Sequence, residues 1–262
     1  MDAAETIDVA HLFSLSGRVA LVTGGAGGFG RAAAEGYLKA GAAVALADLD
    51  AAAVAAAAAA LAPFGRVIAL VCDVADSASV SAAVDAAIER LGQIDILLTA
   101  AGIARRIPAS DLATDQFQLV MDVNVKGTFL TAQAVGRHLI ARRAPGKIIT
   151  VGSVRGLVGH PLGYVAYGTS KGAVHLLTRQ LATEWAEHRI NVNCIAPSVL
   201  KTPLADFILK TPEVRELFMS RIPMGRAAAP AELVGATIFL ASAAADFITG
   251  QVLFVDGGSV AG

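Results

Sequence analysis

Short apolar segments alternate with longer helical stretches along almost the whole chain. Near-continuous apolar strands separated by helices are typical of a parallel sheet that is covered on both faces. We therefore predict an α/β fold in one doubly wound domain, a seven-stranded parallel sheet with helices on both faces. The expected strands are Val19–Thr23, Val44–Ala47, Val67–Val71, Ile94–Thr99, Lys147–Val151, Ile190–Ile195 and Val252–Val255. The apolar stretch Thr237–Leu240 is expected to help complete the sheet together with Ile248–Val255.

Length and composition agree with a single folded domain. The chain has 262 residues, of which 55% are hydrophobic and 16% charged, which excludes the class of disordered chains. The formal net charge is -1 and no basic stripe is present. These features argue against nucleic acid and anionic membrane surfaces as partners. The expected partner is a small-molecule substrate.

The beginning of the chain is expected to be an extension, residues 1–14, that precedes the main domain, residues 15–262. It carries Asp2, Glu5 and Asp8, whereas a signal peptide has a basic start followed by an apolar stretch. The alanine-rich stretch Ala51–Ala62 is too short and too weakly apolar to span a bilayer, and it predicts a helix capped by Asp50. No membrane association is expected.

The two cysteines, Cys72 and Cys194, both lie in apolar runs. They are predicted to be buried thiols in a reducing compartment, because a disulfide framework needs more cysteines at regular spacings. With the features of the N-terminus, this favours a cytoplasmic protein.

A glycine-rich segment, Thr23–Gly30, directly follows the first expected strand and opens a helix. Glycine allows a tight turn and close approach of the backbone to a pyrophosphate, and the helix N-terminus adds free N–H groups. This context predicts a Rossmann-type dinucleotide site, in which Gly24, Gly28, Phe29 and Gly30 contact the cofactor. A purely structural turn is the alternative interpretation.

Asp48 ends the second expected strand, at the position where a carboxylate binds the adenosine ribose hydroxyls. A carboxylate there repels the additional phosphate of NADP, and no Lys or Arg lies within the glycine-rich segment to attract it. NAD is therefore the expected cofactor and NADP the less favoured one, with Leu49 adjoining the site. Asp50 is a local competitor for the role of Asp48.

Four polar residues form a candidate catalytic set. Tyr167 and Lys171 are spaced i and i+4, so they share one face of a helix, and a nearby ammonium favours ionisation of a phenol. Such a pair can exchange a proton with an alcohol or carbonyl. Ser153 lies just past the fifth strand, at the edge of the sheet where ligands bind. Asn124 lies inside an otherwise amphipathic helix, where asparagine is unfavourable without a specific hydrogen-bonding task.

These segments together resemble the short-chain dehydrogenase/reductase family from about Leu15 to Gly258. The resemblance rests on the glycine-rich segment, Asp48, Asp73, Val74, Asn124, Ser153, Tyr167, Lys171, Pro197, Thr202 and the closing Thr249–Gln251 and Val255–Gly258. It implies that Tyr167 is the general acid/base, that Ser153 binds the substrate oxygen, and that Lys171 holds the nicotinamide ribose and lowers the pKa of Tyr167. It also implies that Asn124 positions a water that links Lys171 to a proton relay.

The resemblance extends to the cofactor site. It implies that Asp73 and Val74 flank the adenine, and that Leu200 and Thr202 bind the nicotinamide carboxamide. The remaining expected cofactor contacts are Ala100, Ala101, Gly102 and Pro197.

Two segments depart from the family pattern. Thr99-Ala-Ala-Gly102 stands where the family has Asn-Asn-Ala-Gly, and Pro197-Ser198 stands where it has Pro-Gly. The first departure predicts a looser adenine-side wall and the second an altered loop near the nicotinamide. Neither removes a member of the catalytic set.

Several stretches resemble sugar, sugar-acid and polyol dehydrogenases, with the gluconate 5-dehydrogenase group nearest. Arg105, Arg155 and His160 are candidate substrate residues, with Lys201 beside Thr202, because such groups bind hydroxyls or a carboxylate. Each could also be an ordinary solvated loop charge. Residues 200–224 are expected to form a helical lid over the substrate.

The expected function is oxidation of a sugar, sugar acid or polyol, reversible with its keto form. The alternative enzyme is a 3-oxoacyl-thioester reductase, and the alternative from another class is a non-catalytic redox sensor. The five histidines show no metal spacing, so no catalytic metal is expected. Because relatives in the family are usually dimers or tetramers, a homo-oligomer, either dimer or tetramer, is expected.

Overall fold

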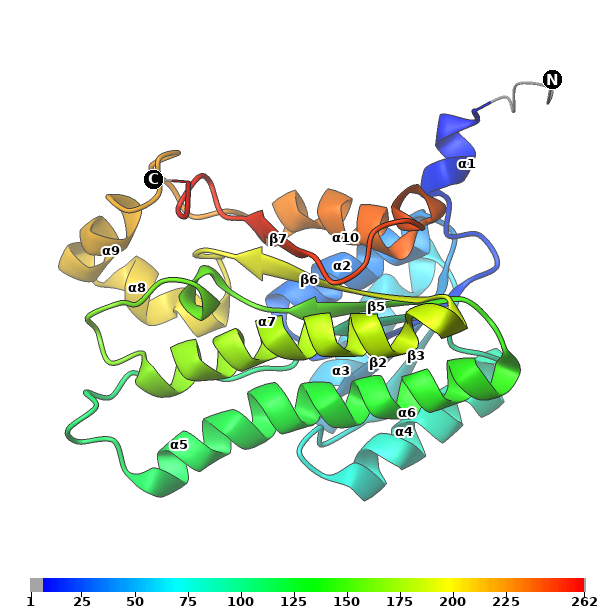
Figure 1. Ribbon diagram of the computed structural model, residues 1–262, viewed down its shortest axis with the longest axis horizontal. Coiled ribbons are helices and arrows are strands. Elements are labelled where there is room, and N and C mark those ends of the chain that lie inside the picture. The colour runs from blue at the N-terminus through cyan, green and yellow to red at the C-terminus, as the bar shows by residue number, and fades with distance from the viewer. Residues whose placement is uncertain (1–6, 262) are drawn as a thin grey trace.

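Seven parallel strands form one continuous sheet through the centre of the molecule in the structure, a computed structural model that describes residues 7–261 (Figure 1). The strands are β1 (Val19–Thr23), β2 (Ala43–Asp48), β3 (Val67–Val71), β4 (Ile96–Thr99), β5 (Gly146–Val151), β6 (Ile190–Pro197) and β7 (Val252–Val255). Their order across the sheet is β3-β2-β1-β4-β5-β6-β7. The order reverses between β1 and β4, so the predicted doubly wound, seven-stranded parallel sheet is confirmed.

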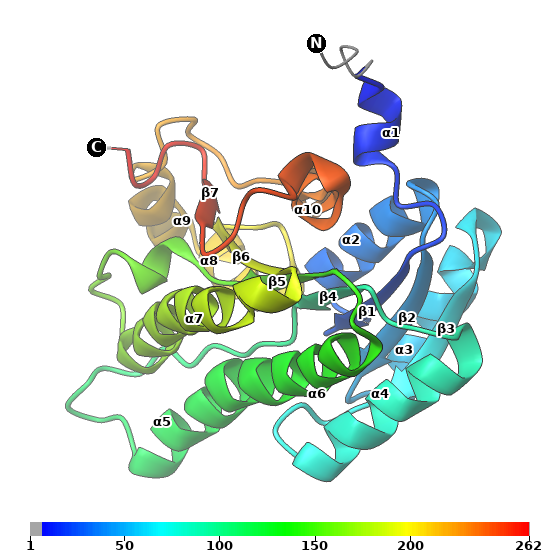
Figure 2. The same ribbon diagram turned by 45° about the vertical axis from the view of Figure 1, so that its right-hand side comes forward.

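Helices cover both faces of this sheet. One face carries α2 (Gly28–Lys39), α3 (Ala51–Leu61) and α10 (Val234–Ala241). The other carries α4 (Ser77–Leu91), α6 (Gly127–Arg142) and α7 (Val165–Trp185). Figure 2 shows α2 and α10 on one side of the strands and α4, α6 and α7 on the other. The remaining helices are α1 (Val9–Phe13), α5 (Thr114–Met121), α8 (Asp206–Lys210) and α9 (Pro212–Met219).

Buried apolar strands explain why the central segments form a parallel sheet. Every residue of β1 is buried, as is every residue of β4. Strands that are apolar on both faces must be shielded from solvent on both sides, so the sheet lies between two layers of helices. Asp50 caps α3 as predicted, because its carboxylate accepts hydrogen bonds from the backbone N–H groups of Ala52 and Ala53.

Two predicted segments differ from the structure. Thr237–Leu240 lies within the helix α10 and not in the sheet, which β7 alone completes. A short apolar run is compatible with a strand or a buried helix, and here the helix packs its apolar side on α2. Asn124 lies in a π-helical turn, Asp122–Lys126, between α5 and α6, and not in regular α-helix. π-Helical turns widen a helix locally and occur often at functional sites.

In Figure 1, α1 lies at one end of the molecule and α8 and α9 lie at the other. Within the expected extension, residues 7–14 are described, and the Phe13 ring lies 6.3 Å from that of Phe239 on α10. The acidic Asp2 and Glu5 lie outside the described residues. None of the helices within residues 7–261 combines the length and apolar character needed to cross a bilayer.

Candidate active site

A cavity of about 320 Å³ opens at the carboxyl ends of β1, β4, β5 and β6. This edge of an open parallel sheet is where ligands bind, and β1 and β4 flank the reversal of strand order. The lining comes from the loops that follow these strands, from the start of α7 and from the segment that contains α8 and α9. The topology therefore brings together residues that lie far apart in the sequence.

The glycine-rich loop forms one end of the cavity. Gly24 has a φ of +65°, and a Cβ placed on it would lie 2.6 Å from the backbone nitrogen of Ala101. A Cβ on Gly28 would lie 2.9 Å from the Thr202 methyl carbon. Side chains at either position would fill the space that these glycines leave, next to the first turn of α2. The loop thus fits a pyrophosphate held by backbone N–H groups, as a dinucleotide site requires.

Asp48, at the end of β2, is hydrogen-bonded to this loop. Its carboxylate accepts hydrogen bonds from the backbone N–H of Ala26 at 3.0 Å and from that of Asp50 at 3.4 Å. Asp50 instead uses its own carboxylate to cap α3. Of these two carboxylates, therefore, Asp48 forms the hydrogen bond to the glycine-rich loop and Asp50 caps a helix.

Not every expected cofactor residue lines the cavity itself. Those that do are Gly24, Gly28, Phe29, Gly30, Ala100, Gly102, Tyr167, Lys171, Pro197, Leu200 and Thr202. Asp48, Leu49, Asp73, Val74 and Ala101 lie outside its lining. The Asp73 carboxylate accepts a hydrogen bond from the Ala75 N–H at 2.9 Å, which orders the turn after β3.

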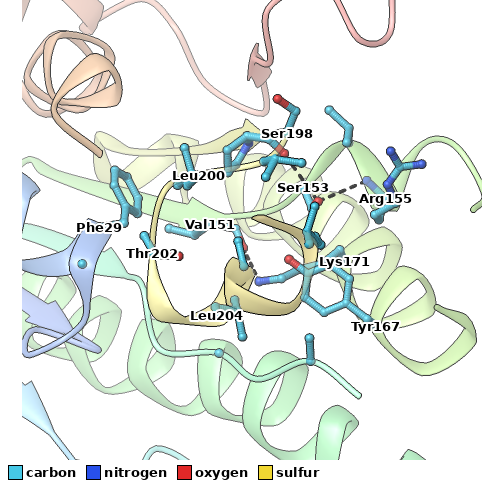
Figure 3. Close-up of a pocket in the computed structure, with 18 of the residues that line it drawn as sticks. Phe29, Val151, Ser153, Arg155, Tyr167, Lys171, Ser198, Leu200, Thr202 and Leu204 are labelled. Carbon is cyan, nitrogen blue, oxygen red and sulfur yellow. Dashed lines mark hydrogen bonds between the residues drawn. The ribbon is translucent and has the colours of Figure 1, made fainter. Parts of the chain in front are cut away.

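Ser153, Tyr167 and Lys171 converge on the middle of the cavity. Figure 3 shows them between Phe29 on the glycine-loop side and Arg155 on the other. The Ser153 hydroxyl donates to the Pro197 carbonyl at 3.4 Å and accepts from the Arg155 N–H at 3.2 Å. The Lys171 nitrogen lies 5.8 Å from the centre of the Tyr167 ring. Ser153, Tyr167 and Lys171 therefore form one wall of the cavity, the catalytic wall.

Burial has opposite effects on the pKa values of Lys171 and Tyr167. It lowers the pKa of Lys171 to about 8, since the ammonium loses hydration. It raises the pKa of Tyr167, an effect opposed by the Ser153 hydroxyl and by the Arg155 and Arg106 charges. The expected depression of the Tyr167 pKa by Lys171 is not present in this arrangement, in which the ammonium donates to the Val151 carbonyl at 2.7 Å.

Asn124 lies behind the catalytic wall and is fully buried. Its amide nitrogen donates to the Ile103 carbonyl and to the Ser170 hydroxyl, each at 2.9 Å, and its side-chain oxygen accepts from the Ile103 N–H at 2.9 Å. The Ser170 hydroxyl donates in turn to the Tyr167 carbonyl at 2.7 Å. Asn124 therefore ties the loop after β4 to the turn of α7 that carries Tyr167 and Lys171.

The two departures from the family pattern fit without strain. The Ala100 N–H donates to the Thr23 carbonyl at 3.1 Å, so the main chain after β4 stays joined to β1. The Ser198 hydroxyl donates to the Asp256 carbonyl at 3.0 Å. Among residues 7–261, Arg143 and Arg189 alone combine a side chain with a positive φ, so Ser198 needs no glycine-like conformation.

The far end of the cavity holds arginine and aromatic side chains. Arg155 lines it as expected, whereas Arg105 turns to Gln116, to which its Nε donates at 3.2 Å, and lies outside the lining. The neighbouring Arg106, which the sequence interpretation did not select, lines the cavity instead. Tyr164, the N-cap residue of α7, also lines the cavity and was missed, although it lies only three residues before Tyr167.

His160 also lies outside the cavity lining. Its ring stacks on Phe218 of α9 with centroids 4.2 Å apart. Burial, with the Arg155 and Arg221 charges, lowers the pKa of His160 to about 4. It is therefore a neutral packing residue behind the cavity wall at neutral pH. Within residues 7–261, no cluster of three or more His, Cys, Asp or Glu side chains is arranged to hold a metal.

Comparison with known proteins agrees with this geometry. A family profile described as Enoyl-(Acyl carrier protein) reductase matches residues 24–259. The chain belongs to the short-chain dehydrogenase/reductase family. This family member is an oxidoreductase that acts on CH–OH groups with a nicotinamide cofactor.

Several relatives of this dehydrogenase/reductase are similar over nearly their whole length. It is 40% identical to the galactitol 2-dehydrogenase (L-tagatose-forming) of Cereibacter sphaeroides, covering 96% of this chain and 98% of the relative. It is also 40% identical to the gluconate 5-dehydrogenase of Gluconobacter oxydans, over 94% and 96%. The crystal structure of a gluconate 5-dehydrogenase from Burkholderia cenocepacia, in complex with NADP and tartrate, matches with a TM-score of 0.93 and 40% identity, covering 97% of this chain and 100% of that one.

Proposed function

We propose that this dehydrogenase/reductase transfers hydride between NAD(H) and a secondary alcohol carbon of a sugar, sugar acid or polyol. The observation that carries the proposal is the convergence of Ser153, Tyr167 and Lys171 within a cavity whose other end is the glycine-rich loop. The relatives named for galactitol and gluconate support the substrate class.

Each residue of the catalytic set has a separate role in the proposed reaction. Ser153 donates a hydrogen bond to the substrate oxygen, and the Tyr167 hydroxyl exchanges its proton with that same oxygen. During ketone reduction the Tyr167 hydroxyl donates its proton to the carbonyl oxygen as a hydride adds to the carbon. During alcohol oxidation the Tyr167 phenolate accepts the O–H proton while the C–H bond breaks. A bound nicotinamide supplies the acceptor for the hydride that leaves this carbon. Lys171 holds the cofactor ribose, and Asn124 keeps the α7 turn in place and positions the water of the proton relay.

The cofactor preference follows from Asp48 in this proposal. Its carboxylate lies against the glycine-rich loop, where it accepts hydrogen bonds from ribose hydroxyls and repels a ribose phosphate. Asp73 and Val74 flank the adenine, and Leu200 and Thr202 bind the carboxamide. Because the Burkholderia cenocepacia relative holds NADP, the two cofactors must be compared directly.

The proposed organisation also includes a lid, an oligomer and a location. The segment 200–224, with α8 and α9, covers the cavity through Leu204, Ile208, Phe218 and Ile222 and opens for substrate. Exposed apolar side chains on α5, α6 and α7, among them Leu119, Phe129 and Leu176, favour a homo-oligomer, either dimer or tetramer. The two buried free thiols are compatible with the cytoplasm.

The test combines a substrate panel with one substitution. The purified protein is incubated with NAD or NADP and a set of polyols, aldonates, uronates and 3-hydroxyacyl thioesters, and formation of reduced nicotinamide is followed by absorbance. NAD-linked turnover of a polyol or sugar acid is expected. Faster NADP-linked turnover of the thioesters would support the 3-oxoacyl-thioester reductase instead.

Tyr167→Phe distinguishes an enzyme from a non-catalytic sensor. The variant is expected to lose about 100-fold or more in kcat while its affinity for NAD, measured by calorimetry, stays within about threefold. Cofactor binding without any turnover by the unmodified protein would favour the sensor.

A further inference from the structure

The charged groups at the substrate end of the cavity all have the same sign. Arg106, Arg155 and Lys171 are the cations of the lining, and no Asp or Glu lines the cavity within residues 7–261. Neither Arg106 nor Arg155 forms a salt bridge with a described carboxylate. A half-buried guanidinium without a counter-charge is unfavourable, so this end of the cavity favours an anion.

Arg155 keeps most of its hydrogen-bonding capacity free. Its Nη1 donates to the Gly159 carbonyl at 3.0 Å, while its Nε and Nη2 have no protein acceptor among the described residues. These two nitrogens form one edge of the planar guanidinium, the edge that matches both oxygens of a carboxylate. The guanidinium is also 5.9 Å from the centre of the Phe218 ring of α9, which limits its orientation.

Arg106 contributes charge and holds the wall next to the cavity. Its Nε donates to the Tyr164 hydroxyl at 3.0 Å and its Nη2 to the Leu204 carbonyl at 2.8 Å. Its guanidinium lies 5.0 Å from the centre of the Phe207 ring. All of these partners are uncharged, so the positive charge of Arg106 is not neutralised by them.

Ser153 connects this cationic end to the reacting centre. Its hydroxyl accepts a hydrogen bond from the backbone N–H of Arg155 at 3.2 Å, so the residue that would bind an anion also orients the residue that would bind the reacting oxygen. A molecule that spans Ser153 and the Arg155 side chain must therefore carry its hydroxyl and its anionic group on one short chain.

We propose that the natural substrate is a hydroxy acid of the sugar-acid type, whose carboxylate binds the free edge of Arg155 in a positive field to which Arg106 contributes. This rests on the proposed function and narrows it, because a neutral polyol offers no counter-charge. The carboxylate selects the substrate and takes no part in hydride transfer. Polyols are expected to be poor substrates for this reason.

Matched pairs of substrates test this directly. Gluconate and sorbitol, galactonate and galactitol, and threonate and threitol each differ in one terminal group, carboxylate or CH2OH. For at least one pair, kcat/KM for the acid is expected to exceed that for the polyol by about tenfold or more, as a charge-assisted pair provides. Equal kcat/KM values for acid and polyol in every pair that reacts would overturn the inference and leave the proposed function intact. A higher kcat/KM for a sugar phosphate than for the matching sugar acid would have the same meaning.

The variant Arg155→Gln tests whether the preference for the acid depends on the Arg155 side chain. It is expected to raise KM for the acid about tenfold to 100-fold and to lower kcat/KM at least about tenfold more for the acid than for the polyol, while Arg155→Lys recovers part of the loss for the acid. Arg137→Gln removes the same charge from the exposed side of α6 and serves as the matched control. Equal losses for acid and polyol in Arg155→Gln would indicate a general structural role and contradict the proposal.

If no substrate of the panel turns over, the proposed function is rejected. Binding measured by calorimetry still tests the inference about the carboxylate in that case. Gluconate is then expected to bind the protein with reduced cofactor more tightly than sorbitol, and Arg155→Gln is expected to remove the difference. Sorbitol binding as tightly as gluconate would overturn the inference by itself.

Discussion

The Lys171 ammonium donates a hydrogen bond of 2.7 Å to the carbonyl oxygen of Val151, the last residue of β5. Ser153 follows Val151 by two residues, so this bond holds α7 against the strand end that presents the serine. The same bond keeps the buried ammonium partnered, although burial still lowers the pKa of Lys171 to about 8. The contact therefore fixes the position of the ammonium, while burial governs its protonation.

The pH dependence of ketone reduction reports on this ammonium. Tyr167 stays protonated between about pH 6 and 9 because its pKa is raised, so it remains able to donate a proton to the ketone. The Lys171 charge is lost as the pH rises through about 8, and kcat/KM for reduction should fall there. Lys171→Met should reduce kcat by about 100-fold and make the profile flat between about pH 6 and 9. A decline near the same pH in the variant would assign the titration to another group.

Cofactor choice should depend on the charge of Asp48. Asp48→Asn removes the repulsion toward a ribose phosphate, and the ratio of kcat/KM with NADP to that with NAD should rise about tenfold. Asp50→Asn is the matched control, because it removes a neighbouring charge and keeps a residue able to cap α3. Equal shifts in both variants would show that only the general field matters.

Acid should destabilise the fold partly through His175. The side chain is 5% exposed, and burial, with the Arg179 and Lys171 charges, lowers its pKa from 6.5 to about 4. The unfolded chain therefore binds more protons between these values, so stability is lost as the pH falls from 6.5 toward 4, by ~3 kcal/mol for a shift of this size. Urea unfolding of His175→Gln should show a shallower loss, whereas the exposed His11→Gln should match the unmodified protein.

Replacing Asn124 should cost stability as well as activity. Asn124→Ala leaves the Ile103 N–H and carbonyl and the Ser170 hydroxyl without their shared partner. Loss of buried hydrogen bonds of this kind should lower the free energy of unfolding by about 2–4 kcal/mol and reduce kcat through displacement of the α7 turn. The control Gln118→Ala removes an exposed amide on α5. A loss as small as that of the control would contradict the positioning role.

Alanine substitutions at two glycines with positive φ can distinguish the cost of an unfavourable backbone conformation from the cost of a steric clash. Gly24→Ala places a methyl group 2.6 Å from the Ala101 nitrogen at a φ of +65°, whereas Gly17→Ala meets nothing within 4 Å at a φ of +76°. Gly17→Ala should lose only about 1 kcal/mol of stability. Gly24→Ala should lose more and also weaken NAD binding at least about tenfold, as measured by calorimetry. Equal behaviour of the two variants would argue against a cofactor role for the loop.

Patterns that depend on near neighbours in the chain were predictable. The segments Val19–Thr23, Val67–Val71 and Val252–Val255 form strands with the predicted bounds, because short apolar runs rich in β-branched residues favour extended backbone. The i and i+4 spacing of Tyr167 and Lys171 placed them on one helical face for a similarly local reason. The order of strands and helices, with glycines after the first strand, restricted the topology further.

Other features depended on contacts between distant segments. Arg105 and Arg106 are chemically the same in sequence, yet Arg106 lines the cavity because Tyr164 and Leu204 supply its acceptors, while Gln116 holds Arg105 outside. The π-helical turn at Asn124 and the contact of Lys171 with Val151 likewise require partners on other elements. Local periodicity sets which residues can form an element, but the direction of a polar side chain depends on which hydrogen-bond partners the packed fold brings within reach.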